Sequence, residues 1–307
     1  MSSIKTQIIP YAGWQNCIQL TNGIVDLIVT VDVGPRIIRY GFVGQENEFC
    51  EIESTMGLTG GDEWRIYGGH RLWHSPESMP RTYVPDNNPV EWEKFHDGIK
   101  TTQDTEPHTL IKKEMEVTLS TGNTAVKIIH RLINKGPWPV ELSVWSLSAM
   151  AKGGKEVIPQ SSKDTGLLPN RIISLWPYTK LNDPRACWGD KYIILQQNTG
   201  MTKPFKFGAS NENGWAAYFN HNHLFIKYYT HKTDARYPDF GVSYETYTND
   251  FMLEMETLSP LTLLEPGAKA EHIERWELFD NVPMPSDNED EIETILLNKI
   301  KKIICHR

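Results

Sequence analysis

The chain is poor in cysteine, has no long apolar run and carries no excess of positive charge. None of its four cysteines (Cys17, Cys50, Cys187 and Cys305) lies in a C-x-x-C pair. Their number and scatter argue against a disulfide framework and a zinc knuckle, so we expect free, mostly buried thiols. No window approaches the roughly 18 uncharged apolar residues that span a bilayer. Acidic residues outnumber basic ones by 39 to 31, which argues against a nucleic-acid partner.

The first residues, MSSIKTQIIPYAGWQN, show no apolar signal core followed by a small-residue cleavage site. We therefore expect a cytoplasmic protein without a membrane partner. The chain of 307 residues contains 10 Trp, 12 Tyr and 10 Phe. Most of these rings are expected to fill a wide core, and the others could stack on the flat face of a ligand such as a sugar.

Strand-like segments follow one another along most of the sequence. Their residues are β-branched or alternate between apolar and polar, at 24–33, 111–120, 124–134, 139–150, 190–198, 214–230, 249–265 and 271–279. Turn signals such as Gly34-Pro35 and Pro266-Gly267 lie between them, and helical periodicity is almost absent before residue 285. This pattern predicts an all-β protein built as an antiparallel sandwich or barrel.

The last segment, 286–307, is the exception because it has the pattern of a capped amphipathic helix. It opens with Ser, Asp and Asn and an acidic first turn, and its apolar residues fall near helical spacing: Ile292, Ile295, Leu296 and Ile300. The acidic front half argues against a membrane-surface helix. We expect one β domain over 1–281 and a helix within 282–307, packed on that domain or against a second copy in a homodimer.

The stretch YGGHRLWHSPE (67–77) is the first candidate site. His70 and His74 share a face on a helix or on a strand. A metalloprotease helix would carry a glutamate after its first histidine, whereas Arg71 stands here and would oppose a divalent cation. We therefore predict no metal and no cofactor. A cleft loop after a Gly-Gly turn is the favoured interpretation, with Arg71 and Trp73 contacting a polyol, and a structural loop is the alternative.

The second candidate is FMLEMETLSPL (251–261). Strand alternation places Glu254 and Glu256 on one face with Met252 and Leu258, and the other face carries Phe251, Leu253, Met255 and Thr257. A carboxylate on an apolar strand is costly to bury unless it is paired, so it often marks a site with a tuned pKa. A glycosidase needs carboxylates on opposite sides of the scissile bond, which neighbours on one strand do not provide. An exposed sheet face remains the alternative.

Seven stretches together resemble a bacterial branch of the galactose mutarotase-like superfamily, the relatives of aldose 1-epimerase. They are VGPRIIRYGF (33–42), GGHRLWHSPE, NKGPWPVELSVWSLSAMAKGG (134–154), LLPNRIISLWPYTKLNDPRACWGDKYI (167–193), KPFKFG (203–208), YPDFGVSYETYTN (237–249) and LEMETLSPLTLLEPG (253–267). The resemblance covers roughly residues 15–280. It implies an antiparallel β supersandwich, followed here by the C-terminal helix, and a sugar mutarotase.

The resemblance also implies roles for single residues. A Glu followed by Thr on a late strand is the base of the family, which Glu256 matches, and Glu254 is then a substrate-binding neighbour. The catalytic His of the family aligns with VWSLSAM (144–150), where this chain has Trp145 and Ser146. The acid would then be His74 or His70 from the preceding loop, with His74 preferred.

Further sugar contacts follow from the same motifs. Arg71 corresponds to the sugar-contacting arginine of the family, and Trp73, Asn170, Lys206 and Asp239 are additional candidates. The partner would be a small-molecule sugar. A non-catalytic carbohydrate-binding protein is the main alternative to a mutarotase. An oligosaccharide lyase or hydrolase is a weaker one, because many lyases with this sandwich add a large helical domain and no segment here could form one.

Overall fold

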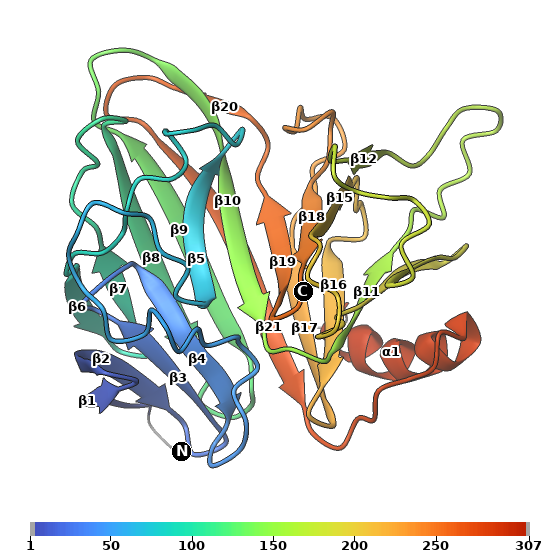
Figure 1. The fold of residues 1–307 in the computed structure, drawn as a ribbon, viewed down its shortest axis with the longest axis horizontal. Helices are drawn as coiled ribbons and strands as arrows, with labels where there is room; N and C mark the ends of the chain where they lie inside the picture. Colours follow the sequence, from blue (N-terminus) through green and yellow to red (C-terminus); the bar gives the residue numbers. More distant parts are fainter. Residues whose placement is uncertain (1–3, 305–307) are drawn as a thin grey trace.

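A computed structural model describes residues 4–304 and shows two large antiparallel sheets and one helix (Figure 1). The first sheet has eleven strands, in the spatial order β1 (Lys5–Tyr11), β2 (Trp14–Thr21), β3 (Val25–Thr30), β4 (Arg36–Phe42), β5 (Gly69–Ser75), β10 (Val140–Met150), β19 (Leu253–Leu258), β18 (Tyr244–Thr248), β15 (Phe205–Ala209) and β12 (Ile173–Leu175), with β20 (Thr262–Leu264) also paired to β10.

The second sheet has ten strands, in the order β13 (Ala186–Trp188), β14 (Tyr192–Gln196), β11 (Lys155–Pro159), β16 (Trp215–Asn220), β17 (His223–Tyr229), β21 (Lys269–Phe279), β9 (Val126–Asn134), β8 (Ile111–Leu119), β7 (Gly98–Thr102) and β6 (Glu91–Phe95). The predicted all-β antiparallel supersandwich with a C-terminal helix is confirmed. The segment 214–230, which the sequence presents as one strand-like run, is a hairpin of β16 and β17 that turns at His221 and Asn222, both with positive φ.

The main core lies between the sheets, and strand parity determines which side chains enter it. Along β10, Leu142, Val144 and Met150 belong to this core, whereas Trp145 and Leu147 point to the other face of the first sheet. Every residue of β5 is nevertheless buried. This strand is therefore covered on both faces. In an antiparallel sheet with one face open to water, alternate residues would be exposed, so other parts of the chain must enclose the outer face of β5.

The two glycines before the predicted cleft residues are needed for the backbone itself. Gly68 and Gly69 have φ of +89° and +68°, a region that residues with a Cβ rarely adopt. A Cβ on Gly69 would lie 2.4 Å from the carbonyl oxygen of Ile37, and one on Gly68 would lie 2.0 Å from that of Cys50. The Gly-Gly pair thus permits the close approach that brings β5 between β4 and β10.

Helix α1 (Glu289–Ile304) packs against the outer face of the second sheet (Figure 1). The Asn288 side chain accepts hydrogen bonds from the backbone N–H groups of Asp290 and Glu291, at 2.9 and 3.0 Å, and so caps the first turn. Ile292, Leu296 and Ile300 are buried in a cluster with side chains of β11, β14, β16 and β17. Within residues 4–304 the structure contains no helix with the length and apolar character needed to cross a membrane.

The cysteines differ in their exposure. Cys17 and Cys50 are buried free thiols, as the sequence predicts, whereas Cys187 is a free thiol at the surface. Cys305 lies outside the described residues.

Candidate functional site

A pocket of about 320 Å³ opens on the face of the first sheet that points away from the second sheet. Its floor comes from β5, β10, β15 and β18–β19, and loops on either side supply its walls. Aromatic rings dominate this lining: Trp64, Trp73, Tyr83, Trp145, Tyr178, Tyr247 and Phe251. Four charged side chains also line it, namely Glu77, Arg71, Lys206 and Glu254.

Arg71 and Glu254 form the first charged pair of this aromatic pocket. Arg71 Nη2 donates a hydrogen bond to Glu254 Oε1 at 3.1 Å. The guanidinium also lies over the rings of Trp73 and Trp64, at 4.1 and 5.3 Å from their centroids. These contacts hold the Glu254 carboxylate at the pocket surface, where a ligand can reach it.

Lys206 is the centre of the second charged group. Its Nζ lies 2.9 Å from Glu245 Oε2 and 3.1 Å from Glu256 Oε2. The ammonium also lies 4.7 Å from the ring centroids of Trp145, on β10, and Trp176, in the loop after β12. Lys206 is 4% exposed and lines the pocket, whereas Glu256 is fully buried beneath it.

The two carboxyl groups around Lys206 are unusually easy to protonate. Burial raises the pKa of Glu256 to about 7, although the Lys206 ammonium opposes this effect. Burial also raises the pKa of Glu245 well above its ordinary range. Trp145 Nε1 donates to Glu256 Oε2 at 2.9 Å, while Glu256 Oε1 has no hydrogen-bond partner. Glu256 can therefore gain or lose a proton near neutral pH.

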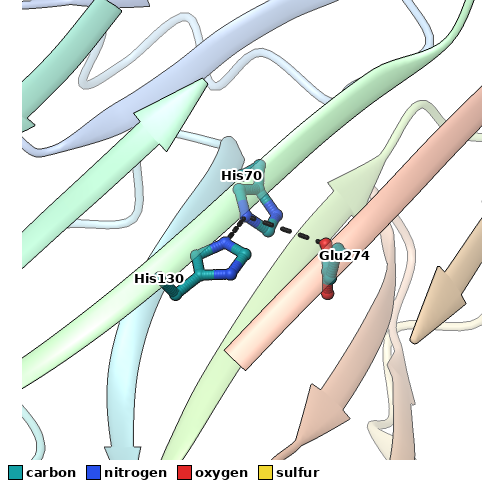
Figure 2. A group of neighbouring side chains, drawn as sticks. All are labelled: His70, His130 and Glu274. Carbon is teal, nitrogen blue, oxygen red and sulfur yellow. Dashed lines mark hydrogen bonds and ion pairs between the residues drawn. The ribbon is translucent and has the colours of Figure 1, made fainter. Parts of the chain in front are cut away.

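The structure does not bring His70 or His74 together with Glu256. On β5, Arg71 and Trp73 face the pocket, so the two histidines and Leu72 point toward the second sheet. His70 Nε2 lies 2.7 Å from His130 Nε2, between the sheets (Figure 2). His74 Nε2 lies 3.7 Å from Glu106 Oε2, beside a separate cavity of about 370 Å³.

His70, His130 and Glu274 form a buried cluster whose possible ligand atoms all lie within 4.8 Å of one another (Figure 2). Hydrogen bonds already account for this arrangement. The Glu274 carboxylate accepts from Thr257, Trp276 and Ser146, and Lys227 Nζ lies 3.1 Å from its Oε1.

Both histidines of this cluster also make hydrogen bonds to residues outside it. His130 Nδ1 donates to the carbonyl oxygen of His272 at 3.1 Å, and His70 Nδ1 lies 2.8 Å from Ser148 Oγ. Burial lowers the pKa of His130 to about 4 and that of His70 well below its usual range, so both are neutral at pH 7. The buried ammonium of Lys227 would oppose a second cation beside Glu274.

The remaining predicted sugar contacts divide between two places. Trp73, Arg71, Lys206 and Glu254 lie together in the aromatic pocket. Asn170 lines a different cavity, of about 570 Å³, and donates a hydrogen bond to the carbonyl oxygen of Lys163. Asp239 lies in the loop beside that cavity and lines neither of these two pockets.

Sequence reasoning missed the aromatic walls and Glu245. Glu245 and Tyr247 alternate in YETYT on β18, directly opposite Glu256 and Glu254 of β19. Trp145 lies in the same cross-strand row as Trp73. Alternation within each strand shows which residues share a face. The sequence does not show which strands are neighbours, so it could not bring these residues together.

No family model and no curated protein matches this sequence. Solved structures match it by shape. The Slr1438 protein of Synechocystis sp. PCC 6803 is 12% identical with a TM-score of 0.57, and the match covers 89% of this chain and 99% of that one. A galactose mutarotase-like protein from Lactobacillus casei is 11% identical with a TM-score of 0.55, over 86% of this chain and 100% of its own.

A galactose mutarotase-like protein from Clostridium acetobutylicum is 11% identical with a TM-score of 0.52, over 91% of this chain and 100% of its own. At such low identity these matches establish only the fold, so any activity has to be inferred from the residues of the site. The chain therefore has the galactose mutarotase-like fold.

Proposed function

We propose that the aromatic pocket binds the pyranose ring of a sugar and that the protein interconverts the α and β anomers of that sugar. The observation that carries this proposal is the combination of stacking rings with two different proton-handling groups, Glu254 and Lys206, around one small pocket. Aromatic rings offer apolar surface to the C–H face of a sugar, and the charged groups offer hydrogen bonds to its hydroxyls.

The backbone positions of the two residues leave room for a ring between them. Lys206 on β15 and Glu254 on β19 are both opposite Tyr247 of β18, so two strand spacings separate their backbones. This separation is about 9–10 Å. A pyranose above Tyr247 would have one group near its anomeric hydroxyl and the other near its ring oxygen.

The chemistry then needs one proton to leave O1 and one to reach the ring oxygen. The Glu254 carboxylate removes the O1 proton while Lys206 Nζ donates a proton to the ring oxygen, and the C1–O5 bond breaks. Protonated Glu256, 3.1 Å from Nζ, returns a proton to the lysine. Rotation about C1–C2 and the reverse steps give the other anomer and restore every proton.

This assignment gives Glu256 a different role from the direct base that the family resemblance implies. Glu256 is sealed beneath Trp145 and Lys206, whereas Glu254 reaches the pocket. A pKa of about 7 lets Glu256 hold a proton at neutral pH, which it can return to Lys206 once the lysine has donated its own.

Nuclear magnetic resonance exchange measurements on D-glucose, D-galactose, D-mannose and D-xylose test the proposal. The protein should accelerate anomer exchange of at least one sugar, and Glu254→Gln should reduce kcat by about 10²- to 10⁴-fold, the usual contribution of a general base. Glu91→Gln on the exposed strand β6 removes a carboxylate away from the pocket and should not change the rate. An unchanged rate in Glu254→Gln would reject this residue as the base.

A non-catalytic sugar-binding protein is the second candidate. It is favoured by one observation, namely that no histidine is among the residues lining the aromatic pocket in the described part of the chain. Measurable binding of a sugar, lost in Trp73→Ala, combined with no acceleration of anomer exchange would support this candidate over the mutarotase.

A further inference from the structure

A wider groove continues from the aromatic pocket. It encloses about 1220 Å³, against about 320 Å³ for the pocket, and the two share Ile66 and Phe251 as lining residues. Residues 46–47 and 49–54 line the groove, together with Ala151, Lys152 and His221. Pockets for one small molecule have about 300–1,000 Å³. The pocket alone suits one sugar unit, and the groove adds room for more.

The polar groups of the groove suit hydroxyl groups. Glu51 and Glu53 can accept hydrogen bonds, and Lys152 can donate them. His221 also lines the groove. Phe251, 38% exposed at the junction, offers a ring to a sugar that passes from the pocket into the groove.

The charge of the groove excludes one class of ligand. Three carboxylates, those of Glu46, Glu51 and Glu53, face it, together with the single ammonium of Lys152. A chain of uronic acids or sulfated sugars would meet net repulsion in this groove. Neutral sugar units meet no such penalty.

We infer that the ligand is a neutral oligosaccharide whose terminal unit occupies the aromatic pocket and whose following units lie in the groove. This inference rests on the proposed function, which places a pyranose in the pocket. Anomer exchange requires a free anomeric hydroxyl, so the unit in the pocket is the reducing end. The next units extend from another hydroxyl of that ring, past Phe251 and Ile66, into the groove.

Isothermal titration calorimetry with matched sugars tests the inference. The probes are D-glucose with maltotriose and cellotriose, D-xylose with xylotriose, D-mannose with mannotriose, and D-galacturonate with its trimer. We expect at least one neutral trisaccharide to bind about tenfold more tightly than its monosaccharide, the gain of one or two additional contacts. The galacturonate trimer should show no such gain.

A blocking variant separates the groove from the pocket. Ser54 is exposed and lines the groove but not the pocket. Ser54→Trp should abolish the trisaccharide gain and leave the monosaccharide Kd unchanged, whereas the control Ser54→Ala should bind both like the wild type. Circular dichroism establishes that both variants are folded.

The outcomes distinguish the inference from the proposed function. Monosaccharide binding without any trisaccharide gain, or a gain that survives Ser54→Trp, would overturn the oligosaccharide inference and leave the pocket assignment standing. A gain confined to the galacturonate trimer would overturn the neutral class. Absence of binding by every probe would count against both the inference and the proposed function.

Discussion

Replacing Glu256 by Gln should change how the stability of the protein depends on pH. Burial raises the pKa of this carboxyl group from an ordinary value of 4.5 to about 7 in the folded state. Between these two values the folded state binds more protons than the unfolded state, so the free energy of unfolding falls as the pH rises. At about 1.4 kcal/mol for each pH unit, the loss reaches about 3 kcal/mol and is complete above pH 7.

Glu256→Gln removes this loss because the amide does not ionise. Lys206 Nζ still lies 2.9 Å from Glu245 Oε2, so the ammonium keeps a carboxyl partner. Urea unfolding at pH 4.5, 6, 7 and 8 should therefore show the variant gaining about 3 kcal/mol relative to the wild type between the lowest and highest pH. Glu91→Gln, on an exposed strand, should follow the wild type at every pH. A difference between Glu256→Gln and the wild type that does not vary with pH would refute the reasoning.

Three further predictions concern the packing of α1, the buried Lys227–Glu274 pair and the face of β5 that carries His74. Leu296→Ala should lower the free energy of unfolding by about 2–5 kcal/mol because the Leu296 side chain is only 1% exposed. The control Leu297→Ala, at a residue that is 40% exposed, should change it by less than about 0.5 kcal/mol. Equal effects of the two variants in urea unfolding would contradict the packing of α1. Lys227→Met should cost about 3–5 kcal/mol, since it leaves the buried Glu274 carboxylate without its cation, and a loss below about 1 kcal/mol would contradict this. His74→Asn should keep the sugar Kd and the anomer exchange rate of the wild type, whereas a large fall in kcat with an unchanged fold would restore His74 as the acid.

The sequence predicted the fold class because strand signals are local. Alternating burial along β8 and β9 reproduces the alternation read from 111–120 and 124–134. The helix was equally visible, since its cap and apolar spacing lie within one segment, although it begins at Glu289 rather than at 286. Short strands such as β12 and β13 have three residues each, too few for any periodic pattern to be recognised.

The site was predicted only in part because it joins strands that are distant in the sequence. Alternation correctly placed Glu254 and Glu256 on one face of β19 and Leu253 and Met255 on the other. It could not show which face meets the second sheet, nor that Lys206 would reach Glu256 across β18, because both depend on the order of the strands. Phe251, assigned to the opposite face from Glu254, lies before β19 and lines the pocket with it.

Strand parity also explains why neither histidine of β5 reaches the pocket. Neighbouring residues of a strand point to opposite faces, so Arg71 and Trp73 can face the pocket only if His70 and His74 do not. A shift of one residue would bring the imidazoles into the pocket, but it would also bury the Arg71 guanidinium between the sheets without Glu254, at a cost of several kcal/mol. The hydrogen bonds of His70 to His130 and Ser148 further fix the observed register. Neither histidine of β5 can therefore supply an acid to a sugar in this pocket. Among the residues that line it, Lys206, held between Glu245 and Glu256, is the acid of the proposed mechanism.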